Sequence, residues 1–106
     1  MSLENEIAPI LNAIGRELIT ATPEIWTSAE LVVEVTYTAQ RTEGMAHFIS
    51  SPEGHGEVVV PTQELMDATF ALLRTYRQHN KSFSALTFTV QLDAEGSWRF
   101  NSKWSY

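Results

Sequence analysis

The first twenty residues place apolar side chains at helical spacing. Apolar residues recur there at intervals of one, three or four positions: Leu3, Ile7, Ile10, Leu11, Ile14 and Leu18. This period is typical of one face of an amphipathic helix, for which Ser2 is a suitable N-cap. Pro9 removes one backbone hydrogen bond from a helix interior. We therefore expect a helix that either bends at Pro9 or begins near Asn5, and that ends before Pro23.

Alternating side chains predict strands in the middle of the chain. Residues 30–38 alternate with a period of two, and residues 45–50 resume an extended pattern after a polar turn. A third short strand is predicted over residues 57–60, between a glycine-containing loop and Pro61. Thr62 can then cap a second helix, whose apolar stripe reaches Tyr76.

The last third of the chain predicts a hairpin. Residues 85–92 alternate apolar and polar side chains, and residues 93–96 form a turn in which Gly96 suits a positive φ. The pattern then continues from Trp98 to the end. The element order α-β-β-β-α-β-β predicts an α+β fold over residues 1–106, one domain with a five-stranded, mainly antiparallel sheet and two helices on one face. Leu86, Phe88 and Val90 are the predicted core of its clearest strand.

Charge divides the chain unequally. Residues 1–73 contain eleven acidic and two basic residues, a net charge of −9, whereas residues 74–106 contain two acidic and five basic residues, a net charge of +3. Scattered basic residues beside an acidic segment are a poor footprint for nucleic acid. We expect no direct nucleic-acid binding, and an acidic surface favours a basic protein partner.

Composition bounds the compartment and the cofactors. The chain has no cysteine, which excludes disulfides and thiolate metal sites. No apolar run approaches the roughly 18 residues of a membrane helix, and the N-terminus lacks the pattern of a secretory signal. These features predict a cytoplasmic protein that does not bind membranes.

Motifs for catalysis are weak. His47, His55 and His79 have no metal-ligand spacing. The serines lack a nucleophile elbow, and the glycine pair at 54 and 56 lacks the phosphate-binding pattern. We therefore predict a protein that is not an enzyme, with no metal and no cofactor.

The aromatic residues of the final strand lie on one predicted face. Trp98 and Phe100 are expected in the core beneath the helices, because aromatic side chains bury large areas. Trp104 and Tyr106 lie where a strand outruns its covering helices. Tryptophan and tyrosine are enriched at binding hot spots, so these two are predicted partner contacts.

The ordered elements carry a resemblance. The segment from Thr22 to Trp26, the long second helix and the run over residues 84–100 resemble the YezG-type immunity proteins of bacterial polymorphic toxin systems. The matching positions are Pro23, Trp26, Leu86, Thr87, Phe88, Gly96 and Phe100. The resemblance implies an immunity protein, or antitoxin, that binds and neutralises a cognate toxin domain, often a nuclease, by stoichiometric protein–protein binding.

Five acidic residues are the predicted partner-binding positions beside Trp104 and Tyr106. They are Glu30, Glu34, Glu43, Glu53 and Glu57. If the first three strands are neighbours, these acids gather on one side and at adjoining ends of the sheet. Two alternatives stay open. One is a small-ligand domain with a pocket lined by Tyr37, Trp98 and Phe100; the other is an assembly module that forms a homodimer, instead of a monomer, through its last strand.

Overall fold

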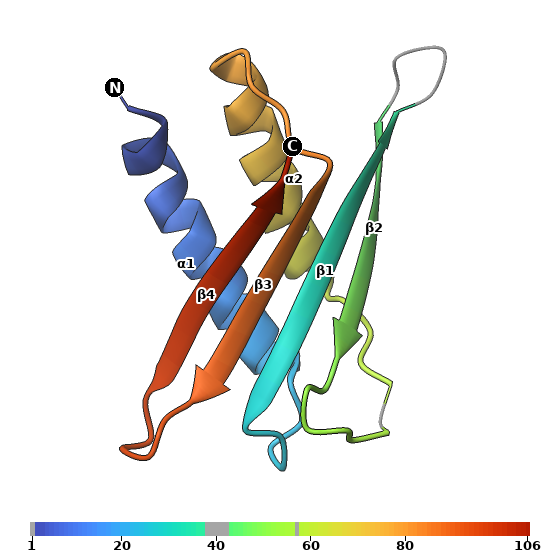
Figure 1. Cartoon of the computed structure of the whole chain (residues 1–106), viewed down its shortest axis with the longest axis vertical. Coiled ribbons are helices and arrows are strands. Elements are labelled where there is room, and N and C mark those ends of the chain that lie inside the picture. Colours follow the sequence, from blue (N-terminus) through green and yellow to red (C-terminus); the bar gives the residue numbers. More distant parts are fainter. Residues whose placement is uncertain (1, 38–42, 57) are drawn as a thin grey trace.

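Two helices and four antiparallel strands make up the part of the chain that the computed structural model describes, residues 2–37, 43–56 and 58–106. The elements follow one another as α1 (Leu3–Ala21), β1 (Ser28–Tyr37), β2 (Glu43–Ser50), α2 (Gln63–Gln78), β3 (Ala85–Leu92) and β4 (Trp98–Ser105). The strand order is β2-β1-β3-β4, with every neighbouring pair antiparallel. Figure 1 shows the sheet in front of the helices.

Both helices begin where the sequence predicts a cap. The Ser2 hydroxyl accepts a hydrogen bond from the backbone N–H of Asn5 at 3.3 Å, and the Thr62 hydroxyl accepts one from Leu65 at 3.1 Å. These caps satisfy N–H groups that have no partner inside the helix. α1 begins at Leu3 and continues through Pro9, so the expected start near Asn5 is two residues late. Asn5 and Pro9 are exposed, so water can reach the carbonyl that Pro9 cannot serve.

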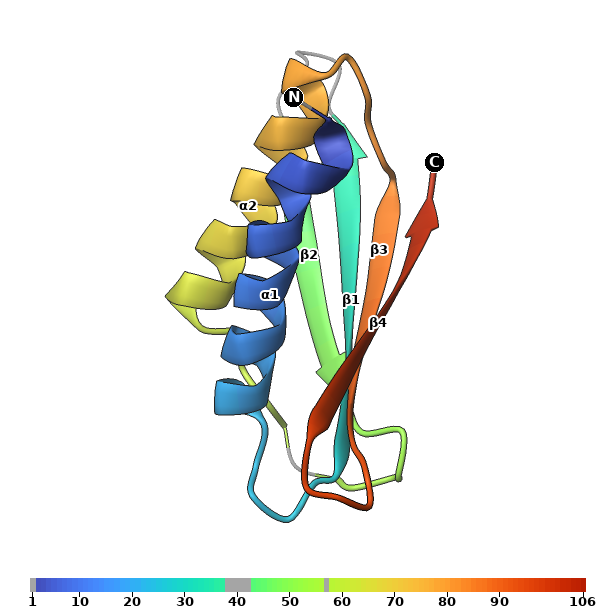
Figure 2. The same ribbon diagram turned by 90° about the vertical axis from the view of Figure 1, so that its left-hand side faces the viewer.

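The helices cover one face of the sheet and leave the other open (Figure 2). The covered face buries alternate residues of the two central strands, which confirms the core predicted for residues 86–90. The buried residues are Ala29, Leu31, Val33 and Val35 on β1 and Leu86, Phe88 and Val90 on β3. The stripe of α2 from Leu65 to Tyr76 is buried against them. Residues that alternate with the core positions therefore face away from the helices.

The prediction of five strands is wrong in one place. Residues 58–60 form no strand, and Glu57 lies outside the described residues. Val58 and Val60 are exposed by 90% and 74%, while Val59 packs on the core. A run of three valines is too short to build a stable ladder. Pro61, which follows directly, cannot extend it because proline has no backbone N–H to donate. The element order is therefore α-β-β-α-β-β.

The β3–β4 turn has the predicted chemistry. The Asp93 carboxylate accepts hydrogen bonds from the backbone N–H groups of Glu95 and Ser97, both at 2.9 Å. Gly96 has a φ of 84°, which glycine adopts without strain. The hydrogen bond from Ser97, followed by those from Glu95 and Arg99, lowers the pKa of Asp93. These bonds fix where β4 begins.

Candidate partner-binding surface

The open face of the sheet carries two of the predicted acidic residues. Glu30 and Glu34 alternate with the buried residues of β1 and therefore project away from the helices. Glu34 is exposed and Glu30 is half-buried. At about 3.3 Å per residue, four positions along a strand separate the two by about 13 Å. The first strand thus presents two carboxylates in one row.

An exposed aromatic ring lies beside this row. Phe48 of β2 pairs with Val32, which lies between the two glutamates on β1. Paired residues of neighbouring strands project on the same face, and Phe48 is 55% exposed. We call Glu30, Val32, Glu34 and Phe48 the β1–β2 patch. It combines an apolar centre with flanking negative charge.

Basic residues occupy the far side of the same open face. Arg99 and Lys103 of β4 pair with Gln91 and Thr87 of β3 and project on the face opposite the helices. β3 separates them from the glutamates of β1. The open face is therefore acidic and apolar over β1 and β2 and basic over β4.

Glu53 has a structural role within the fold, and its role as a partner contact stays a prediction. Its carboxylate accepts hydrogen bonds from the Thr27 backbone N–H at 2.8 Å, the Thr27 hydroxyl at 2.7 Å and the Ser28 hydroxyl at 3.1 Å. The bonds from the Thr27 side chain and backbone lower the pKa of Glu53. Glu53 thus ties the loop after β2 to the start of β1, and its acceptor capacity is used within the fold.

Glu43 lies at the far end of the β1–β2 ladder from Glu30. Glu43 pairs with Tyr37, whereas Glu30 pairs with Ser50. Glu57 lies outside the described residues. Of the five acids, Glu30 and Glu34 share the open face of β1, and their role in binding a partner stays a prediction.

Trp104 belongs to a packed aromatic cluster and is not the exposed contact that its terminal position predicts. Its ring stacks on Tyr76 with centroids 5.0 Å apart and meets the edge of Phe83 at 5.2 Å. Tyr106 is 79% exposed. Burial and a hydrogen bond with Tyr106 raise the pKa of Tyr76 to about 12. Tyr106 remains an accessible aromatic residue, and Trp104 extends the core under the end of β4.

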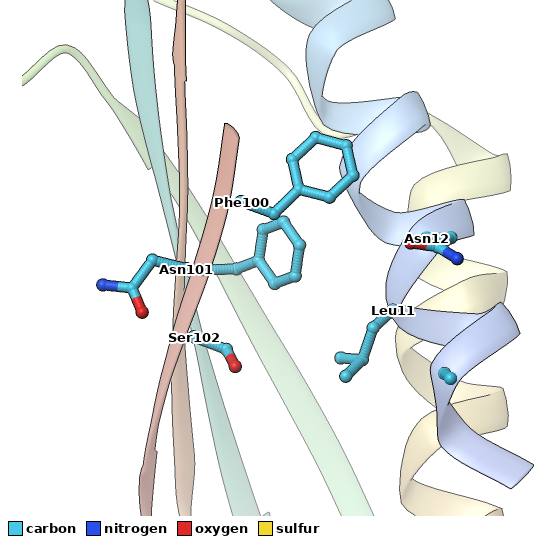
Figure 3. Close-up of a pocket in the computed structure, with 7 residues that line it drawn as sticks. Leu11, Asn12, Phe100, Asn101 and Ser102 are labelled. Carbon is cyan, nitrogen blue, oxygen red and sulfur yellow. The ribbon is translucent and has the colours of Figure 1, made fainter. Parts of the chain in front are cut away.

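Phe100 is more exposed than the core position predicted for it. Its ring turns toward α1 beside a groove of about 340 Å³, which β4 and α1 line together (Figure 3). From α1 the groove receives Ala8, Leu11 and Asn12, and from β3 and β4 it receives Phe88, Phe100, Asn101 and Ser102. Phe100 is 42% exposed, while Trp98 is half-buried against the core. The rim of β4 is therefore an accessible apolar edge.

The pocket suggested for a small ligand is not formed by the three predicted residues. Trp98 pairs with Leu92 at one end of the sheet, and Tyr37 pairs with Glu43 at the other end. Phe100 instead faces α1 (Figure 3). The three aromatic residues thus line no common cavity.

The histidines are held by packing and by single polar partners. His47 Nε2 lies 2.7 Å from the hydroxyl of Thr69, a fully buried residue of α2, and burial lowers the pKa of His47. His55 stacks on Trp26 with ring centroids 5.7 Å apart. His79 caps the C-terminus of α2 and pairs with Glu6 of α1. Within the described ranges, no three or more such side chains are grouped where a metal ion could bind.

Two features of the surface were missed from the sequence. Phe48 lies between two other apolar or aromatic residues, and its side of the sheet becomes clear only from its pairing with Val32. Gly15 lies in the first helix and leaves space for the ring of Phe100 on β4. The pattern of the helix alone does not indicate this contact. The side of the sheet on which Phe48 lies follows from alternation. His47 and Ile49 pair with the buried Val33 and Leu31, so Phe48 between them faces the open side.

Comparisons with known proteins assign no family. No protein-family model matches the chain, and the comparison with curated proteins found no match. In the described part of the chain, neither helix has the length and apolar character needed to span a bilayer.

Proposed function

We propose that the protein is an immunity protein, which binds a cognate toxin domain and blocks it stoichiometrically. The observation that carries the proposal is the β1–β2 patch, where two carboxylates flank an exposed aromatic ring on a sheet face that no described helix covers. A protein of this class needs an exposed, shape-specific surface and no catalytic group.

The chemistry of the patch favours a basic partner. Glu30 and Glu34 lie in the segment of the chain with a net charge of −9. Complementary charge accelerates the encounter of two proteins and excludes wrong partners. Nuclease domains bind a polyanion and therefore present basic surfaces, so a nuclease is the toxin class that this surface fits best.

Phe48 adds an apolar contact to the charged residues of the β1–β2 patch. Binding energy concentrates in a few central residues that become fully desolvated, and aromatic anchors are prominent among them. An apolar centre with a polar rim is the usual arrangement of such interfaces. In this proposal Phe48 is the anchor, Glu30 and Glu34 form the rim, and Tyr106 lies outside the contact.

Co-expression tests the proposal directly. We expect the reading frame beside this one to encode the toxin domain, and that domain is expressed in bacterial cells with and without this chain. We expect growth to be rescued and a complex of fixed stoichiometry to co-purify. Continued growth arrest with the soluble chain present, or the absence of a complex, would contradict the proposed function.

A further inference from the structure

The outer edge of β4 carries backbone groups that point away from the sheet. Asp93 N–H donates to the Ser97 carbonyl at 2.8 Å, which makes residues 93 and 97 a hydrogen-bonded pair. Hydrogen-bonded pairs recur at every second residue of an antiparallel ladder. The backbone groups of Arg99, Asn101 and Lys103 are therefore the ones that bond to β3. The intervening N–H and C=O groups therefore face the free edge: those of Trp98, Phe100, Ser102 and Trp104.

The groove between β4 and α1 runs beside this edge. The side chains of Phe100 and Ser102 project into it from β4, and Leu11 projects into it from α1 (Figure 3). A strand that pairs with β4 in antiparallel orientation places every second side chain on the helix side of the sheet. Those side chains would enter the groove and contact Phe100.

The opposite side of the same edge is basic. Arg99 and Lys103 project on the open face, and the side chain of Arg99 is 76% exposed although its Nε lies 3.1 Å from Asp93. Side chains of an added strand that alternate with the groove-facing ones would lie next to Arg99 and Lys103. Opposite charges on neighbouring strands stabilise a pairing, and like charges destabilise it.

From these three observations we infer that β4 accepts an extended segment of a partner protein in which apolar and acidic residues alternate. The segment adds a fifth strand antiparallel to β4, places its apolar side chains in the groove beside Phe100, and pairs its acidic side chains with Lys103 and Arg99. This mode of recognition takes its affinity from backbone hydrogen bonds and its specificity from alternate side chains. It uses a surface distinct from the β1–β2 patch and does not depend on the proposed function.

Charge argues against a second copy of this chain as the occupant. Antiparallel pairing of two β4 strands would bring Arg99 and Lys103 of one protomer beside the same residues of the other. Such like-charge neighbours are unfavourable on a sheet face. The groove lies beside β4 and not beside β2, the other edge strand of the sheet.

A nine-residue peptide with alternating valine and glutamate, blocked at both ends and carrying a fluorophore, tests the inference by anisotropy with the full chain. We expect saturable binding, and no binding of the matched peptide with lysine in place of glutamate. Lys103→Glu should weaken binding about threefold to tenfold. The matched control is Lys81→Glu, which changes the same charge at an exposed residue before β3 and should leave binding unchanged.

Backbone methylation separates edge pairing from nonspecific adsorption. In the inferred pairing, the valine N–H groups point at β4 and the glutamate N–H groups point away. N-methylation of the valines should therefore abolish binding, and N-methylation of the glutamates should preserve it. Ser102→Pro, which removes one outward N–H and keeps the ladder with β3, should also abolish binding while the far-ultraviolet spectrum of the fold is retained.

Amide hydrogen exchange locates the peptide. We expect the N–H groups of Phe100 and Ser102 to exchange more slowly when the peptide is bound. Equal binding of the two methylated peptides, equal binding of the glutamate and lysine peptides, or protection confined to other strands would overturn the inference. The inference would also be overturned if the free protein sediments as a dimer and the amides of Phe100 and Ser102 are already protected. A second copy of the chain would then occupy the edge of β4.

Discussion

The ring of Phe100 occupies the space in which a side chain at position 15 would begin. A Cβ atom built on Gly15 would lie 2.7 Å from both Cε2 and Cζ of Phe100, closer than carbon atoms approach one another in proteins. Gly15 is buried in the middle of α1. The glycine therefore sets how closely α1 approaches β4, and with it the width of the groove beside Phe100.

Gly15→Ala tests this contact through a double-mutant cycle. Alanine is favoured over glycine inside a helix by about 1 kcal/mol, but in the native protein the new methyl group displaces the ring. We expect the substitution to stabilise Phe100→Ala by about 1 kcal/mol and the native chain by clearly less. Urea denaturation measures both. Equal effects in the two backgrounds would show that the ring does not rest on Gly15.

Phe88→Ala tests the assignment of the covered face. Phe88 is 2% exposed at the centre of β3, with its ring centroid 5.9 Å from that of Phe100. Truncating a buried phenylalanine costs about 3–5 kcal/mol, a large share of the stability of a small domain. We expect a large fall in the melting temperature, and a change of only a few degrees would contradict the burial of this strand face.

His47 makes the fold sensitive to mild acid. The Thr69 hydroxyl donates its hydrogen to the Met66 carbonyl at 2.8 Å and therefore accepts from the Nε2–H of neutral His47. Burial lowers the pKa of His47 below its ordinary value of 6.5, so the unfolded chain binds the proton more tightly. Stability should fall as the pH decreases from 6.5 toward that lower pKa.

His47→Gln removes this dependence, because a glutamine amide can donate to Thr69 without titrating. Urea midpoints measured between pH 8 and pH 5 should decline less for the variant than for the native chain. Identical profiles would mean that His47 is not buried in its neutral form.

Glu53 should affect folding and not association. The hydrogen bonds from Thr27 hold its pKa below the ordinary value of 4.5. Its contribution to stability is therefore present above pH 4.5 and is lost as the pH falls through the lower folded pKa. We expect Glu53→Ala to lower the melting temperature at pH 7 and to differ less from the native chain at pH 3. A toxin association rate that changes with this substitution would restore Glu53 to the binding surface.

The sequence predicts elements whose signal is local. Hydrophobic period and capping chemistry lie within one segment, which is why both helices, the turn at Gly96 and the core at Phe88 were predicted. The segment at 58–60 fails because a strand also needs a neighbour to pair with, and three valines before a proline provide too short a ladder.

The candidate surface was predicted less completely, because its side chains depend on contacts between distant segments. The Glu53 carboxylate accepts a hydrogen bond from Thr27, which lies 26 residues away in the sequence. The ring of Trp104 packs on Tyr76. Neither pairing leaves a trace in the local pattern. Glu30 and Glu34 lie on the open face of β1, which the alternation of residues along a strand alone decides.

The most direct test of the β1–β2 patch is the association rate of the toxin domain with Glu30→Lys/Glu34→Lys, measured by stopped flow at low and at physiological salt. The control is Glu24→Lys/Glu95→Lys, which makes the same change of charge at exposed loop residues outside the open face. We expect the patch variant to fold, to associate at least tenfold more slowly at low salt and to lose most of the salt dependence, while the control stays close to the native rate. A patch variant that associates as fast as the control at both salt concentrations would contradict a binding role for this face.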